Sequence, residues 1–202
     1  GYYEDAVAQV GLDQSVLAYR RLRDPVSGRG KSNIDHARDA FDHIRRLGTC
    51  CAVALDIKSF FESLDHQRLK QAWAKLLSCS RLPDDHYAVF RAVTEYREVE
   101  LDAALVALGH VTLHQDRWGN NRRLRARDDQ GNPLPIPIQL CTPAQFRQMI
   151  AGDGAGRGLI KPNPKRYGIP QGSPLSDLLA NLYLLDFDLR MNRQLQAVGG
   201  VY

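Results

Sequence analysis

The stretch Ala54-Leu55-Asp56-Ile57-Lys58-Ser59-Phe60-Phe61 places an aspartate directly after a short apolar run. That run, Cys50–Leu55, is nearly all apolar, which is typical of a strand buried on both faces. An acid at the end of such a strand is costly unless it is paired or binds a cation, and Mg²⁺ prefers carboxylate oxygens. The sequence therefore predicts a strand that presents Asp56 to a metal. The alternative is an aspartate that only caps the following turn.

A second polar stretch lies far downstream, where Gly168-Ile169-Pro170-Gln171-Gly172 forms a predicted turn. Ser173 caps a predicted helix, and Pro174 occupies its first position, where a missing N–H costs nothing. Leucines at helical spacing follow. The free N–H groups of this helix N-terminus favour anions. The alternative is an ordinary turn that begins a helix.

The rest of the chain predicts more helices than strands, and the fold class is α+β. Periodic apolar positions predict helices over 4–18, 33–46, 66–78 and 84–96, the second capped by Ser32 or Asn33 and the third by Asp65. Residues 97–167 are rich in turn residues and predict an elaborated surface region with short elements, not a second domain. Val201-Tyr202 reads as the opening of a strand.

Composition is that of a globular protein. Of the 202 residues, 44% are hydrophobic and 25% charged, which excludes disorder of the whole chain. No apolar run approaches the ~18 residues of a membrane span, and the N-terminus does not read as a signal peptide. The four cysteines form no zinc or disulfide pattern. We expect a cytoplasmic protein with no membrane partner.

The net charge of +4 permits a polyanionic partner without demanding one. Basic residues crowd two stretches, 20–31 and 117–127, and each is either a solvated loop or an arm that contacts phosphates. The candidate nucleic-acid-binding residues are Arg20, Lys31, Arg122, Arg123 and Arg125.

Two motifs carry a family resemblance. Asp56-Ile57-Lys58-Ser59-Phe60-Phe61-Glu62-Ser63-Leu64-Asp65-His66 resembles the first catalytic motif of bacterial reverse transcriptases. Gly168-Ile169-Pro170-Gln171-Gly172-Ser173-Pro174-Leu175-Ser176, followed by Leu179-Ala180-Asn181-Leu182-Tyr183, resembles their second palm motif. Ala18-Tyr19-Arg20 and Gly30-Lys31-Ser32 precede the first strand as in that family. The resemblance covers most of the chain and is weak over 97–140.

The resemblance implies part of the fingers and most of the palm of a right-hand polymerase, with a small buried sheet packed on helices. Residues 1–50 would be fingers-side helices, 51–96 the first palm strand and helices, 97–167 the insertion, and 168–202 the second palm motif and its helix. The implied activity is RNA-directed DNA polymerisation from dNTPs on an RNA or DNA template-primer, with Mg²⁺ or Mn²⁺ as cofactor.

The same resemblance implies roles for residues of the first motif. Asp56 looks like a catalytic aspartate that binds the metals, and the carbonyl of Ile57 like a further metal contact. The backbone amides of Lys58 and Ser59 would approach the triphosphate. Phe61 matches the steric-gate position that favours dNTPs over rNTPs, and its alternative role is a core phenylalanine.

Gln171 and Gly172 match positions of the second motif near the incoming nucleotide. The phrases 140–147 and 184–188 resemble the abortive-infection and defence-associated reverse transcriptases, which implies a role in antiphage defence. A group II intron-type reverse transcriptase or maturase is one alternative, and a palm-shaped nucleic-acid-binding module without catalysis is another. No aromatic-x-Asp-Asp motif occurs after the second motif, so we expect this chain to be an inactive segment of a larger enzyme, whose oligomerisation stays open.

Overall fold

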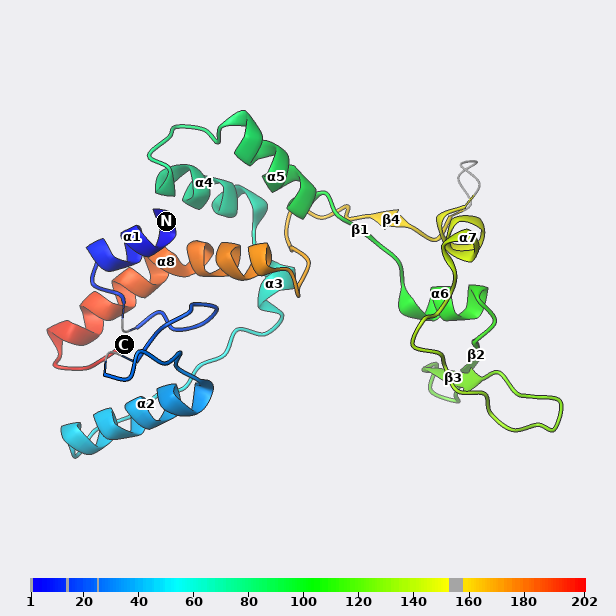
Figure 1. The fold of residues 1–202 in the computed structure, drawn as a ribbon, viewed down its shortest axis with the longest axis horizontal. Helices are drawn as coiled ribbons and strands as arrows, with labels where there is room; N and C mark the ends of the chain where they lie inside the picture. The colour runs from blue at the N-terminus through cyan, green and yellow to red at the C-terminus, as the bar shows by residue number, and fades with distance from the viewer. Residues whose placement is uncertain (1, 14, 25, 153–157) are drawn as a thin grey trace. The chain divides into compact units, whose positions relative to one another are not determined.

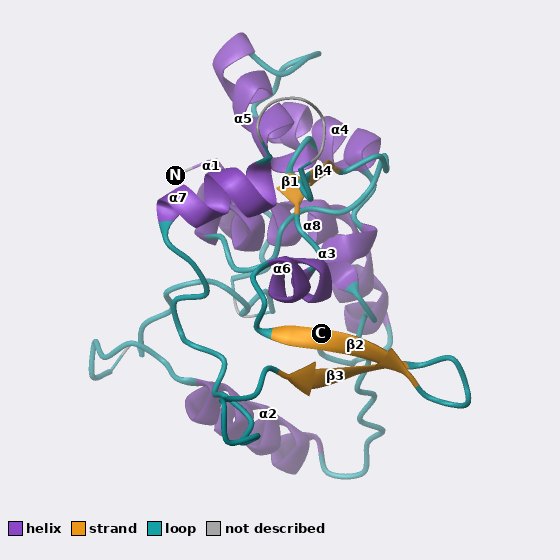
Figure 2. Cartoon of the chain, turned by 90° about the vertical axis from the view of Figure 1, so that its right-hand side faces the viewer, coloured by secondary structure: helices purple, strands orange, loops and turns teal. Residues whose placement is uncertain are grey.

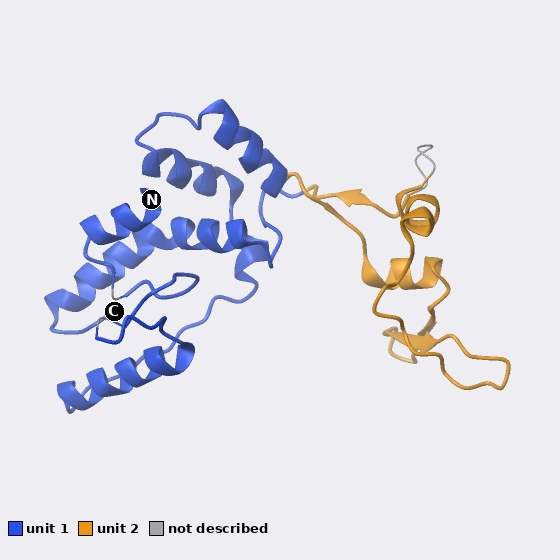
Figure 3. Ribbon diagram, viewed as in Figure 1, with its two compact units in different colours: residues 1–94, 165–202 blue, residues 95–164 orange. Residues whose placement is uncertain are grey.

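The computed structural model describes residues 2–13, 15–24, 26–152 and 158–202. Within them lie eight α-helices, one π-helical turn and two small antiparallel sheets, so the fold is mixed α and β (Figure 1). The chain divides into two compact units, coloured separately in Figure 3. Unit 1 comprises Gly1–Thr94 and Lys165–Tyr202, and unit 2 comprises Glu95–Pro164. The predicted insertion, 97–167, covers nearly the same residues as unit 2.

The first helix is shorter than the sequence predicts. Helix α1 spans Tyr2–Gln9, whereas the periodic pattern extends to residue 18. Gly11 adopts a positive φ of 70°, the Leu12 N–H donates to the Val7 carbonyl, and the Gly11 N–H donates to the Ala8 carbonyl. This pair of hydrogen bonds is the Schellman motif that ends helices. Val7 and Leu12, both fully buried, add the apolar contact that accompanies the motif.

Helix α2, Asn33–Leu47, begins and ends where the sequence predicts. Ser32 caps it in a reciprocal capping box with Asp35, and the Gly48 N–H donates to the Ile44 carbonyl at its end. Hydrogen bonds from the Ser32 backbone and hydroxyl, and then from Arg29, hold the pKa of the Asp35 carboxyl well below its usual range. The apolar stripe of α2 is exposed, with Phe41 67% accessible.

The predicted strand over 50–55 is wrong. Residues 50–57 have no regular secondary structure and are all exposed; Val53 is 75% and Leu55 85% accessible. A strand needs a neighbour to pair its backbone. Both described sheets lie in unit 2, so none of their strands pairs with 50–57. Asp56 therefore does not end a buried strand.

Four helices follow in unit 1: α3, Phe60–Ser63; α4, His66–Leu76; α5, Asp84–Thr94; and α8, Pro174–Ala197. The Asp65 carboxylate accepts from the Arg68 N–H at 2.8 Å, and the Ser173 hydroxyl accepts from the Leu175 N–H, so both predicted N-caps are confirmed. Among the described residues, even the longest helix lacks the sustained apolar length needed to cross a membrane.

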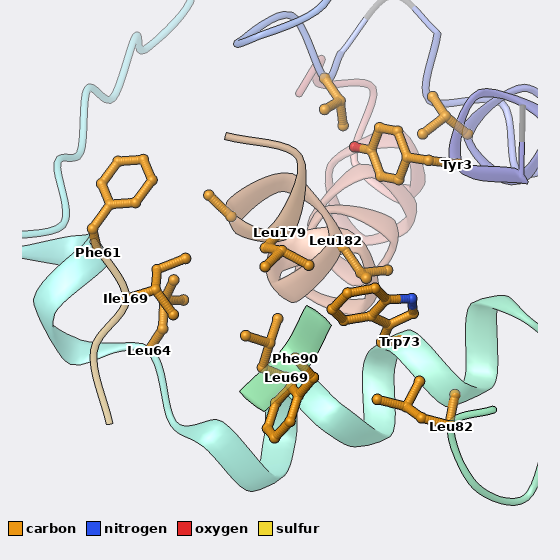
Figure 4. Packing of buried hydrophobic residues seen from close by; sticks show 14 of the residues in the cluster. Tyr3, Phe61, Leu64, Leu69, Trp73, Leu82, Phe90, Ile169, Leu179 and Leu182 are labelled. Atoms are coloured by element: carbon orange, nitrogen blue, oxygen red, sulfur yellow. The ribbon is translucent and has the colours of Figure 1, made fainter. Parts of the chain in front are cut away.

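The core of unit 1 joins α1, α4, α5 and α8 to the turn before α8. Figure 4 shows Trp73 of α4, Leu179 and Leu182 of α8, and Ile169 of the turn among its side chains. The buried members are Tyr3, Val7, Leu12, Val16, Phe61, Leu64, Leu69, Trp73, Ala74, Leu82, Phe90, Ile169, Leu179, Ala180 and Leu182. Burial of these apolar side chains stabilises the contact between segments far apart in the sequence.

Unit 2 consists of short elements, as its turn-rich sequence predicts. Strand β1, Arg97–Glu98, pairs antiparallel with β4, Lys161–Pro162, and β2, Val111–Gln115, pairs antiparallel with β3, Asn121–Arg125 (orange in Figure 2). The helical elements are α6, Leu101–Ala107; α7, Pro143–Gln145; and the π-helical η1, Phe146–Ala151. Leu105, Val111 and Ile150 are its buried apolar residues among those described.

Candidate nucleotide and nucleic-acid site

The two sequence motifs lie against each other in unit 1. The Ile169 N–H donates to the Phe61 carbonyl at 2.8 Å, and the Gly168 N–H donates to the Leu64 carbonyl at 2.8 Å. Asp65 and Tyr167 form an antiparallel bridge between the same segments. Although 115 positions separate Asp56 from Gln171, backbone hydrogen bonds join the motifs that contain them.

Gly168 permits this close approach. Its φ is +88°, and a Cβ atom there would lie 3.0 Å from the Glu62 carbonyl oxygen. A side chain at this position would therefore meet both backbone strain and a backbone atom that cannot easily move. Any residue other than glycine would push the second motif away from the first.

His66 adds a side-chain link that the sequence analysis missed. Its Nε2 lies 2.7 Å from the Gly168 carbonyl oxygen, so the ring nitrogen donates there, and its ring meets Phe90 edge-on. Its backbone N–H donates to the Arg166 carbonyl at 3.1 Å. The sequence places His66 inside the first motif, but spacing alone gives no signal of a partner 102 positions away.

Asp56 and its neighbours form an exposed segment. Asp56, Lys58 and Ser59 are exposed, and Ile57 is 49% accessible. Ser59 has a positive φ of 51° and directly precedes α3, which turns the chain from this segment toward Phe61. The backbone groups of 57–59 are therefore open to solvent at the side of the motif contact.

The metal site expected at Asp56 stays a prediction. A solvent-exposed carboxylate is a suitable Mg²⁺ ligand. In the described parts of the chain, however, no three His, Cys, Asp or Glu side chains gather into a group able to hold a metal ion. Asp56 therefore belongs to no such group among the described residues.

Phe61 is part of the core. Its side chain is 8% accessible, and its ring lies 6.1 Å from the Tyr19 ring and 5.8 Å from the Phe60 ring, measured between centroids. The ring thus packs within the protein, as the core alternative predicts, at the point where the first motif meets Ile169.

Gln171 and Gly172 form an exposed turn immediately before α8. Gly172 has a φ of +93° and leaves open space where a side chain would stand. Only one residue, Pro170, separates Gln171 from Ile169, which is hydrogen-bonded to Phe61. The turn is thereby tied to the first motif.

The basic residues upstream of α2 are engaged within the protein. The Arg20 guanidinium is 5% accessible, contacts Glu4 at 2.7 Å, and donates to the Val16 carbonyl at 2.7 Å. Lys31 is 16% accessible and pairs with Asp39 at 2.7 Å. This geometry gives both residues a structural role, because their charges are already matched by carboxylates.

The β2–β3 hairpin of unit 2 carries the second basic stretch. All five residues of β3 are exposed, including Arg122, Arg123 and Arg125. Arg123 is paired with Asp102 of α6, and the register sets Arg122 opposite His114. At the hairpin turn, the Arg117 guanidinium stacks on the exposed Trp118 ring, 4.0 Å from its centroid. The hairpin therefore offers cations and one aromatic face to an anionic partner.

Two aspartates of α8 have partners within the protein. Asp186 pairs with Lys75 at 2.7 Å, and buried Asp188 accepts from the Tyr202 hydroxyl at 2.6 Å. Burial raises the pKa of Asp188.

No protein-family model matches this chain, and no curated protein matches it either.

Proposed function

We propose that this chain is the fingers-and-palm portion of a bacterial reverse transcriptase-type DNA polymerase. The observation that supports it most is the hydrogen-bonded contact between residues 61–65 and 167–169. The two motifs that would share one nucleotide site are adjacent in unit 1, although the whole of unit 2 intervenes in the sequence. The chemistry would be transfer of nucleotidyl groups from dNTPs to a primer.

The proposed roles follow the exposure of each residue. Asp56 would bind Mg²⁺ or Mn²⁺, with the Ile57 carbonyl beside it, and the backbone amides of Lys58 and Ser59 would face the triphosphate. Gln171 and Gly172 would border the base of the incoming nucleotide. Because the described residues form no group of three potential metal ligands, a complete site requires further oxygen ligands.

Template and primer would be RNA or DNA, and the β2–β3 hairpin is the candidate contact in unit 2. Arg122 and Arg125 are exposed there. Arginines bind phosphates irrespective of base sequence, so this contact would add affinity that weakens with salt. The biological setting that the resemblance favours is bacterial antiphage defence, and an intron-type maturase is the alternative within the family.

A second function is favoured by one observation. Asp56 belongs to no group of potential metal ligands in the described parts of the chain. This favours a palm-shaped module that binds nucleic acid and lacks catalysis. The two functions differ in whether Asp56 is needed for incorporation of dNTPs.

Incorporation of labelled dNTP by the full-length gene product tests the proposal. Asp56→Ala should lower the single-turnover rate by about 10²- to 10⁴-fold, because a lost metal ligand removes several kcal/mol of transition-state stabilisation. Asp129→Ala, another exposed aspartate, is the matched control and should leave the rate unchanged. Equal rates for Asp56→Ala and the unaltered protein would contradict the metal-binding role and favour the non-catalytic module.

A further inference from the structure

A groove between α4 and α8 lies outside the two motifs. Its volume is about 670 Å³, within the usual range for sites that take a nucleotide-sized ligand. Both helices belong to unit 1, and Figure 1 shows them side by side. We call it the α4–α8 groove and define it by six of its lining residues: Arg68, Lys75, Tyr183, Asp186, Phe187 and Arg190.

The charge of the groove is positive. Three cations stand against one carboxylate, Asp186, which pairs with Lys75 at 2.7 Å. That pair is exposed on both sides (70% and 55%), and such pairs contribute little, so a phosphate can compete for the lysine. Among the described residues, no carboxylate pairs with the guanidinium of Arg68 or of Arg190. Two arginines are therefore available for charge-assisted hydrogen bonds to phosphate oxygens.

The groove also exposes an aromatic ring. Phe187 is 48% accessible although it lies in the middle of α8, between paired Asp186 and buried Asp188. Tyr183, one turn earlier, is fixed by an edge-on contact with Phe60, with 6.2 Å between ring centroids. A flat apolar ring beside free arginines is the combination that single-stranded nucleic acids use, because bases stack on the ring while phosphates meet the cations.

We propose that the α4–α8 groove binds single-stranded nucleic acid, with phosphates on Arg68, Arg190 and Lys75 and a base stacked on Phe187. This contact is additional to the nucleotide site formed by the two motifs and to the β2–β3 hairpin, and it does not depend on catalysis. An anionic membrane surface or an acidic peptide could meet the cations, but neither would supply a base for Phe187.

Fluorescence anisotropy with labelled dT12 and rU12 tests the charge contribution. In the full-length gene product, Arg68→Gln/Arg190→Gln should weaken binding about tenfold and lower the slope of log affinity against log salt by about 1.4. The matched control is Arg45→Gln/Arg46→Gln, which removes the same charge from the exposed end of α2. The control should change neither quantity by a comparable amount.

The aromatic contribution is tested separately. Phe187→Ala should weaken binding about 5- to 150-fold with an unchanged salt slope, because it removes a ring and no charge. Phe187→Tyr should restore the affinity, because it keeps an aromatic ring. Phe41→Ala, which removes an exposed ring from α2, should have no effect. Equal weakening by the control variants, or no weakening by the groove variants, would overturn the proposal.

Crosslinking of the unaltered protein removes the dependence on variants. Oligonucleotides carrying 5-iodouracil should crosslink to peptides that contain Tyr183 or Phe187, and crosslinks confined to other peptides would overturn the proposal. If the groove crosslinks but the protein incorporates no dNTP, only the proposed polymerase function is contradicted. If the protein incorporates dNTP but the groove does not crosslink, only the proposed groove site is contradicted.

Discussion

Phe61 makes contacts through both its side chain and its backbone, and the backbone contact joins the two motifs. Its ring packs against the rings of Tyr19 and Phe60, while its carbonyl accepts from Ile169. A residue held in this way contributes to the stability of unit 1 whether or not it also limits the space for a ribose. The two roles predicted for Phe61, steric gate and core phenylalanine, therefore differ in what its removal should change: the choice between dNTPs and rNTPs, or the stability of unit 1.

Phe61→Ala should lower the free energy of unfolding by about 3 kcal/mol, because it leaves a cavity in the core. Urea denaturation followed by circular dichroism measures this loss. Phe41→Ala is the matched control on exposed α2 and should change stability by less than about 0.5 kcal/mol. A small loss for Phe61→Ala, together with greater use of rNTPs, would instead favour the steric-gate role.

Local capping was predictable at the residue scale, and long-range pairing was not. Ser32, Asp65 and Ser173 were predicted as N-caps, because a cap depends on neighbours within three residues. The pairing of Arg20 with Glu4 was not predictable, since it depends on how α1 approaches a loop 16 positions away. The hydrogen bond from the His66 ring to the Gly168 carbonyl was not predictable either, since 102 positions separate the two residues.

At the element scale, the segment 50–57 departs furthest from the sequence prediction. Its apolar run has the composition of a buried strand, but a strand also requires hydrogen-bonding neighbours that a local pattern does not specify. In contrast, α2 begins and ends close to its predicted bounds, and α8 begins at its predicted cap, because caps and apolar spacing are local. The exposed stripe of α2 shows that periodicity predicts a helix without predicting what covers it.

Hydrogen exchange should distinguish the observed segment from the predicted strand. Amides of residues 50–57 should exchange within seconds, because among the described residues no recorded backbone hydrogen bond protects them. Amides in the middle of α8 are the internal reference and should exchange far more slowly. Protection of 50–57 comparable to that of α8 would indicate a paired strand and contradict the exposed arrangement.

At the scale of the whole molecule, the chain consists of two units. A helical unit holds both motifs, and the second unit, made of short strands and helices, lies between the motifs in the sequence. The sequence predicts an elaborated surface region over 97–167 and not a second domain, because turn-rich composition does not show whether the short elements pack into a compact unit, as Glu95–Pro164 do. The contact between the motifs was not predictable from spacing, because 115 positions of chain separate Asp56 from Gln171. We propose that these two motifs form one nucleotide site.

Photoaffinity labelling with 8-azido-dATP and Mg²⁺, followed by peptide mapping, tests whether the two motifs form one nucleotide site. If the motifs share a nucleotide site, the label should appear on peptides from both 56–66 and 168–176. Excess unlabelled dATP should remove it from both, since one bound nucleotide contacts both segments. Label confined to other peptides, or label on these two that dATP does not displace, would contradict the claim.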